Sequence, residues 1–151
     1  MKNLKEVLNK RLEKVNSHYS VLKEYKEFIE KLGDIYNVKD FEKLNIQERA
    51  VLEAYLKRFA SLQDYLGAKV FPLLLENKGV IANKMSEVIS FVEKEGIIDL
   101  EIWLKFRQVR NEPEHDYPDD LEDALNDLKF CVDKFDEMEK IVKKVFDYAK
   151  A

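Results

Sequence analysis

The chain has 151 residues, of which 46% are hydrophobic and 37% charged, and its formal net charge is −4. With only four glycines and three prolines, this composition excludes a disordered chain and a β fold of many strands. The length predicts one domain, residues 1–151, with a single core. The negative charge argues against a general nucleic-acid coat, so any contact with a polyanion needs a local site.

Cysteine content and hydropathy limit the class of protein further. Cys131 is the only cysteine, which excludes an internal disulfide and a zinc site built from several cysteines. Its helical surroundings predict a buried, reduced thiol. The first residues form no apolar signal segment, and no window approaches the ~18 apolar residues of a membrane span. We therefore expect a cytoplasmic protein without a membrane segment.

Apolar residues recur every three or four positions along nearly the whole chain, which predicts helices. A first long helix over residues 4–32 ends at Gly33. A second helix begins where Asn45 and Glu48 have the spacing of a capping box. It carries an apolar stripe to residue 66.

The middle of the chain predicts shorter helices. Gly67 and Pro72 favour a kink or a break near the end of the second helix. A third helix fits residues 85–94. Asp99 can cap a fourth, over residues 100–111.

Pro118 starts a long fifth helix, whose apolar stripe runs from Leu121 to Val145. The long helices at the two ends of the chain can pack antiparallel, with the middle helices against them. The predicted fold is therefore an all-α bundle of about five helices.

Common cofactor and metal motifs are absent from the sequence. There is no glycine-rich phosphate loop, no HExxH, no pair of cysteines and no ExxH pair. We predict neither a cofactor nor a metal. His18, one of two histidines, is expected at the surface or at an edge rather than as a ligand.

Residues 107–118 read RQVRNEPEHDYP and contain the main candidate site. Trp103, Phe106 and Arg110 are spaced by three and four, so Arg110 continues the apolar stripe of the fourth helix. In the simpler interpretation, Arg110 pairs with an acid of the last helix and His115 caps the turn. Alternatively, His115 takes the 2′-OH proton of RNA and Arg110 holds the phosphate charge.

Two neighbouring polar residues fit the second interpretation. Asn111 can orient a phosphate oxygen, and Tyr117 can hydrogen-bond to a base or stack on it. A helix end and the turn that follows it can present all these groups at one edge. Spacing alone leaves both interpretations open.

The stretch RNEPEHDY, residues 110–117, resembles the RN-xxx-H-x-Y motif of HEPN domains. It is most similar to HepT-like toxins and to the nucleotidyltransferase substrate-binding proteins, both partners of minimal nucleotidyltransferases. The upstream stretches GIIDLEIWLKFRQVRN and RFASLQDYLGAKVFPLLLE resemble the same family. Together these stretches cover roughly residues 50–150.

The resemblance implies a function and partners. It implies a homodimer with a composite cleft, acting as a metal-independent endoribonuclease toxin in which Arg110 and His115 are catalytic. Asn111, Arg107 and Tyr117 would bind the RNA substrate. A cognate minimal nucleotidyltransferase antitoxin would silence the toxin by adding AMP to Tyr117.

The charge around the motif favours a different function within the same family. Residues 111–127 hold eight Asp or Glu and no Lys or Arg, which repels an RNA backbone. The alternative is a noncatalytic substrate-binding subunit that pairs with a small nucleotidyltransferase.

Overall fold

The computed structural model describes residues 3–111 and 121–151, with the side chains of residues 110 and 111 left out. Every regular element in these ranges is helical, which confirms the predicted all-α fold. Each helix in the same ranges is too short or too polar to cross a membrane. In chain order the elements are α1 (Leu4–Lys31), α2 (Val38–Glu42), α3 (Ile46–Tyr65), the π-helix η1 (Leu66–Val70), α4 (Phe71–Glu76), α5 (Met85–Lys94), α6 (Leu100–Asn111), α7 (Leu121–Asp133) and α8 (Phe135–Lys150).

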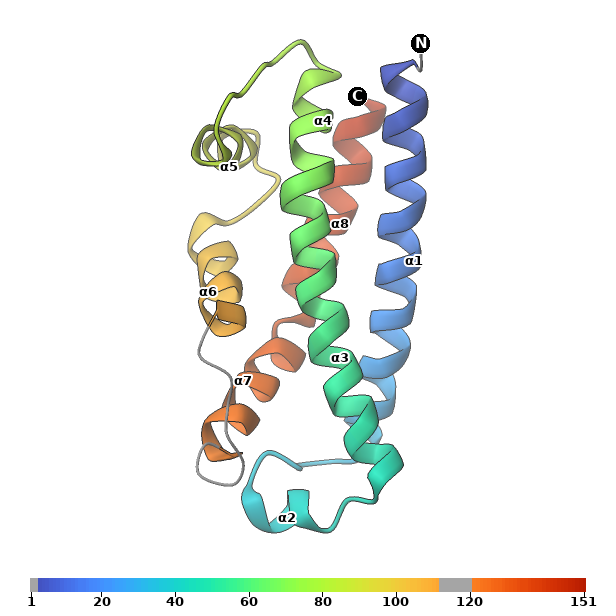
Figure 1. Cartoon of the computed structure of the whole chain (residues 1–151), viewed down its shortest axis with the longest axis vertical. Coiled ribbons are helices and arrows are strands. Elements are labelled where there is room, and N and C mark those ends of the chain that lie inside the picture. Colours follow the sequence, from blue (N-terminus) through green and yellow to red (C-terminus); the bar gives the residue numbers. More distant parts are fainter. Residues whose placement is uncertain (1–2, 112–120) are drawn as a thin grey trace.

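Three long rods form the bundle (Figure 1). They are α1, the continuous run α3–η1–α4, and α8, and α1 lies against both of the others. The chain descends along α1 and ascends along α3 and again along α8, so both ends of the chain lie at the same end of the bundle. The predicted antiparallel packing of the two terminal helices is confirmed. Helices α5 and α6 lie to one side of these rods, as Figure 1 shows.

The predicted fifth helix is divided in two. Lys134 leaves the helical conformation, with φ −96° and ψ 14°, and separates α7 from α8. The apolar stripe continues through this position, with both Val132 and Phe135 buried, so the stripe alone did not indicate the break. The predicted start at Pro118 lies outside the described residues.

The helix ends follow from local hydrogen bonds. The predicted capping box is present: Glu48 N–H donates to Asn45 Oδ1 at 2.8 Å, and Asn45 N–H donates to Glu48 Oε1 at 2.9 Å. Gly33 follows the last turn of α1 with a φ of +80°, a conformation that glycine adopts without strain. The sequence reading missed α2, because five residues are too few to show a helical period.

The expected kink in the second helix takes the form of the π-helix η1. Pro72 has no N–H, and in a regular α-helix its ring would clash with the carbonyl of Ala68, so the ordinary helical bond is lost at that point. The chain widens there, and Phe71 N–H bonds back to the carbonyl of Leu66. The wider turn keeps α3 and α4 in line as one rod (Figure 1).

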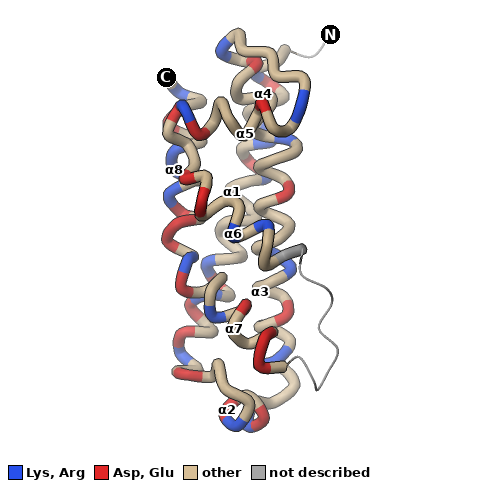
Figure 2. The backbone as a smooth tube through the Cα atoms, turned by 90° about the vertical axis from the view of Figure 1, so that its left-hand side faces the viewer, with Lys and Arg blue, Asp and Glu red and all other residues tan. Residues whose placement is uncertain are grey.

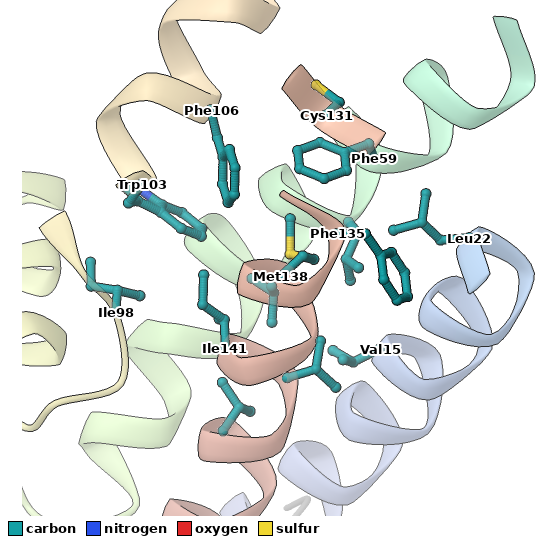
Figure 3. Close-up of a cluster of buried hydrophobic side chains, with 14 of the residues drawn as sticks. Val15, Leu22, Phe59, Ile98, Trp103, Phe106, Cys131, Phe135, Met138 and Ile141 are labelled. Carbon is teal, nitrogen blue, oxygen red and sulfur yellow. The ribbon is translucent and has the colours of Figure 1, made fainter. Parts of the chain in front are cut away.

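Helix α6 is attached to the bundle by two aromatic side chains (Figure 3). The ring of Trp103 lies 5.1 Å from that of Phe71, and Phe106 meets Phe59 edge to face at 5.0 Å. Both α6 side chains are almost fully buried. The predicted stripe of this helix is therefore correct for both residues.

A buried hydrogen bond joins α3 to α7. The Tyr55 hydroxyl donates to the carbonyl of Cys131 at 2.7 Å. The Cys131 thiol is free and buried, as predicted, and burial raises its pKa to about 12. It therefore remains a thiol at neutral pH and packs as a small apolar group.

Removing the Trp103 ring tests whether α6 depends on this attachment. Trp103→Ala leaves a cavity beside Phe71, and we expect the free energy of unfolding to fall by about 3–5 kcal/mol in urea denaturation. Ile81→Ala is the control, because Ile81 is 78% exposed and its truncation should change the same quantity by less than about 0.5 kcal/mol. Equal effects of the two changes would contradict this account of α6.

Candidate functional site at the end of helix α6

The structure places part of the predicted site. Arg110 and Asn111 are the last two residues of α6, and Arg107 lies one turn before its end. His115 and Tyr117 lie outside the described residues, as do the side chains of Arg110 and Asn111. The backbone thus brings the three α6 residues to one helix end, and the pairing of Arg110 with His115 stays a prediction.

Packing of α6 fixes the direction of this helix end. Phe106, one turn before Arg110, contacts Phe59 of α3 and lies 6.0 Å from Phe130 of α7. It therefore links the helix before the motif to the helix after it. A site on the last turn of α6 is held by the core of the bundle, which is the rigid support that a catalytic group requires.

Arg107 is half-buried and faces a small cavity between α3, η1, α5 and α6. The cavity holds about 90 Å³. Its lining includes Gln63, Asp64, Gly67, Met85, Trp103 and Arg107.

Polar atoms are buried in the wall of this cavity. The Gln63 side-chain amide donates to the carbonyl of Trp103 at 3.2 Å. Gln63 Oε1 and Trp103 Nε1 are also buried, and neither has a hydrogen-bond partner in the described part of the chain. An acceptor and a donor in one wall can bind a small polar group, and the volume is large enough for water.

The sequence reading missed Gln63, although a signal existed. Gln63 falls four residues after Phe59 and three before Leu66, on the buried side of α3, and it is only 1% exposed. A polar residue on an apolar stripe indicates a buried hydrogen bond. It therefore identifies the place where α3 touches α6.

The charges around the helix end are unevenly distributed. Arg110 lies in the last turn of α6 and Arg107 one turn earlier, near the negative end of the helix dipole, which favours cations. The first turn of α7 carries Glu122 and Asp123, and Figure 2 shows acidic residues there. The dipole at this end does not attract phosphate, so the attraction has to come from cationic side chains such as that of Arg107.

A second cavity lies beside the start of α7. It holds about 320 Å³ between α2, α3 and α7, with Leu121 and Leu125 in its wall. The Arg49 guanidinium lies 4.8 Å from the Phe41 ring centroid, and its Nε is buried with no partner among the described residues. The cavity suits a flat apolar group next to a cation. No sequence motif pointed to it.

Of the two histidines, His18 is the one that lies within the described residues, and it occupies the edge position expected of it. It is half-buried on α1, and the Arg58 guanidinium donates to its Nδ1 at 3.1 Å. Burial lowers the pKa of His18, and nearby Arg58 and Lys14 lower it further. Because Arg58 can only donate, His18 is neutral in this pair and carries its proton on Nε2.

Comparison with known proteins adds no relative to this description. No protein-family model, curated protein or solved structure matches the chain. Within residues 3–111 and 121–151, no group of three or more His, Cys, Asp or Glu side chains is arranged to hold a metal ion. The family resemblance therefore rests on the motif and on the upstream stretches of the sequence.

The environment of His18 predicts how it titrates. Its pKa should lie below 6.5, and Arg58→Gln should raise that pKa. His18 therefore contributes stability above pH 6.5, and this contribution is lost as the pH falls and the ring is protonated. The pKa is measured by NMR from the Cε1 proton, assigned by its loss in His18→Gln.

Lys57→Gln removes the same charge from the neighbouring position on α3 and serves as the control. Lys57 is not among the groups that shift the pKa of His18, so this change should leave that pKa unchanged. An unchanged pKa of His18 in Arg58→Gln would show that the Arg58 contact does not form in solution.

Proposed function

We propose that this protein is a metal-independent endoribonuclease toxin of the HEPN type. The observation that supports it best is the placement of Arg107, Arg110 and Asn111 within the last two turns of a helix anchored in the core. The sequence follows this helix end with His115 and Tyr117 in the spacing of the RN-xxx-H-x-Y motif.

The proposed reaction is a phosphoryl transfer within the RNA strand. His115 takes the proton of the 2′-OH, whose oxygen forms a bond to phosphorus while the bond to the 5′-oxygen breaks. The leaving 5′-oxygen receives a proton from protonated His115 or from water. Arg110 neutralises the charge that builds on the phosphate oxygens, which its two-pronged guanidinium suits.

The other predicted residues position the substrate. Asn111 orients a phosphate oxygen, and Arg107 adds a second cation one turn earlier on α6. Tyr117 contacts a base and is also the acceptor of AMP from a cognate minimal nucleotidyltransferase antitoxin. Such a modification adds negative charge at the motif, which repels the RNA substrate.

A homodimer with both motifs in one cleft completes the proposal. Support comes from Leu104, which is 49% exposed on α6 and lies seven residues before Asn111. Two helical turns place these residues on one face. An apolar residue on that face suits an interface between two copies.

The acidity of residues 111–127 favours a second function. A noncatalytic subunit that presents substrate to its nucleotidyltransferase would not need to hold RNA at the motif. Glu122 and Asp123, both in the first turn of α7, belong to this acidic stretch.

The catalytic assignment predicts the effect of two substitutions. His115→Ala removes the base, and we expect RNA cleavage in the presence of EDTA to fall at least ~10²-fold. Arg110→Ala should give a loss of similar size, and both variants should relieve growth inhibition by the unpartnered protein. Cleavage is followed on labelled RNA in gels.

Lys105→Ala is the matched control on the same helix. Lys105 is exposed and pairs with Glu101 at 3.5 Å, so its loss should change cleavage little. If the wild-type protein neither cleaves RNA nor slows growth, the ribonuclease is ruled out and the binding subunit is supported.

The dimer is tested by light scattering at high micromolar concentration. The wild-type protein should have the mass of two chains, and Leu104→Lys should shift it towards one chain, because a charge is costly to bury in an apolar contact. Ile46→Lys places the same charge on a residue that is 78% exposed at the start of α3, and it should leave the mass unchanged. A monomeric wild-type protein would contradict the composite cleft.

A further inference from the structure

Helices α1 and α3 run antiparallel in direct contact along the bundle (Figure 1). Basic residues at helical spacing follow their shared border. On α1 these are Arg11, Lys14 and His18, which are separated by three and four and therefore lie on one face. Arg58 of α3 faces them from the other helix.

Contacts across the border between α1 and α3 fix the positions of these side chains. Arg11 donates to the carbonyl of Lys69 at 2.7 Å, and Lys14 Nζ lies 4.9 Å from the ring centroid of Tyr65. The rings of Tyr65 and His18 are 6.0 Å apart, and Arg58 donates to His18. We call Arg11, Lys14, His18, Arg58 and Tyr65 the basic ladder.

The cations of the ladder form no ion pair with a carboxylate in the described part of the chain. Each ion pair between described residues joins a lysine to a carboxylate three or four positions away. Arg11, Lys14 and Arg58 take part in none of these pairs. The charged groups that shift the pKa of His18 are both cations.

The acidic residues that are adjacent in sequence to ladder residues face other parts of the molecule. Glu13, next to Lys14, lines a cavity between α1 and α8. Asp64, next to Tyr65, lines the cavity against α6. The positive charge of the ladder is therefore not neutralised by the two carboxylates that flank it.

We infer that the basic ladder binds the phosphate backbone of single-stranded RNA. Arg58, Lys14 and Arg11 supply the charge, and the Nε2–H of His18 supplies a further donor. From Arg11 to His18 the ladder extends along α1 for roughly 10 Å. The inference rests on the proposed function only in taking RNA as the ligand.

An acidic protein segment is the competing ligand, and the composition of the ladder disfavours it. Protein partners usually dock through a buried apolar or aromatic anchor. The aromatic ring of the ladder, Tyr65, already carries the Lys14 ammonium over its face. Backbone phosphates need only the ordered cations that the ladder provides.

Bound phosphate would also change the ladder itself. The contact between Arg58 and neutral His18 places a guanidinium against the ring, and this cation disfavours the protonated form of His18. An anion between them favours the protonated ring, so RNA binding should raise the pKa of His18. A purely structural contact would not respond to RNA.

The test measures binding of a fluorescent, single-stranded 2′-O-methyl RNA by anisotropy from about 50 to 200 mM salt. This RNA has no free 2′-OH, so cleavage does not disturb the measurement. We expect the double variant Lys14→Gln with Arg58→Gln to lower the affinity at least about tenfold. It should also reduce the slope of log affinity against log salt by about 1.4, which corresponds to two phosphate contacts on a single strand.

Lys143→Gln is the matched control, because it removes a charge that already pairs with Glu139 at 3.9 Å on α8. It should leave the affinity and the salt slope unchanged. Circular dichroism checks that all variants are folded.

Three results would overturn the inference: no RNA binding by the wild-type protein, equal binding by the double variant, or competition by polyglutamate as strong as by RNA. The same samples are tested for cleavage of all-ribose RNA. Binding through the ladder without cleavage supports the ladder and removes the ribonuclease. Cleavage together with binding that does not depend on the ladder supports the ribonuclease and removes the ladder.

Discussion

The position of the candidate site depends on how α6 is seated on the α3–η1–α4 rod. Trp103 packs against Phe71, and Phe106 packs edge to face against Phe59. The Trp103 ring also packs over Gly67 of η1, where a Cβ would lie 3.4 Å from the ring, an ordinary van der Waals distance. The side helix and the long rod are thus fitted to each other at η1. The last turn of α6, with the candidate site, takes its position from that fit.

Much of the fold could be predicted because its determinants are local or periodic. The capping box at Asn45 and the bounds of α5 follow from a few adjacent residues, and the buried stripes follow from helical spacing. The short helix α2 has no period to detect. The break at Lys134 interrupts a stripe that continues on both sides, so it depends on tertiary packing rather than on composition.

The candidate site was predictable in part for the same reason. Arg107, Arg110 and Asn111 could be assigned to a helix end from the apolar spacing of Trp103 and Phe106. Gln63 could not be assigned to this site, because its partner is a backbone carbonyl 40 residues away. The Arg58–His18 contact could not be predicted either, because it joins two helices whose register is set only when the bundle forms.

Charge on this molecule is distributed unevenly, both between segments and between helix faces. Several lysines on exposed faces pair with carboxylates three or four residues away, and such pairs contribute little to stability or to long-range attraction. The acidic stretch around the motif adds repulsion for a polyanion. A chain with this surface can attract RNA only where cations gather without nearby carboxylates.

The α3–η1 rod places both candidate surfaces on a single rigid element. Asp64 faces the α6 cavity beside Arg107, whereas the next residue, Tyr65, faces Lys14 and His18 on α1. Consecutive helix positions differ by about 100°, so adjacent residues reach different sides of the rod. A strand of RNA held on the ladder would therefore lie on a different side of the rod from the α6 cavity. Binding and cleavage would then be separate tasks, with attraction supplied by α1 and α3 and chemistry by the motif.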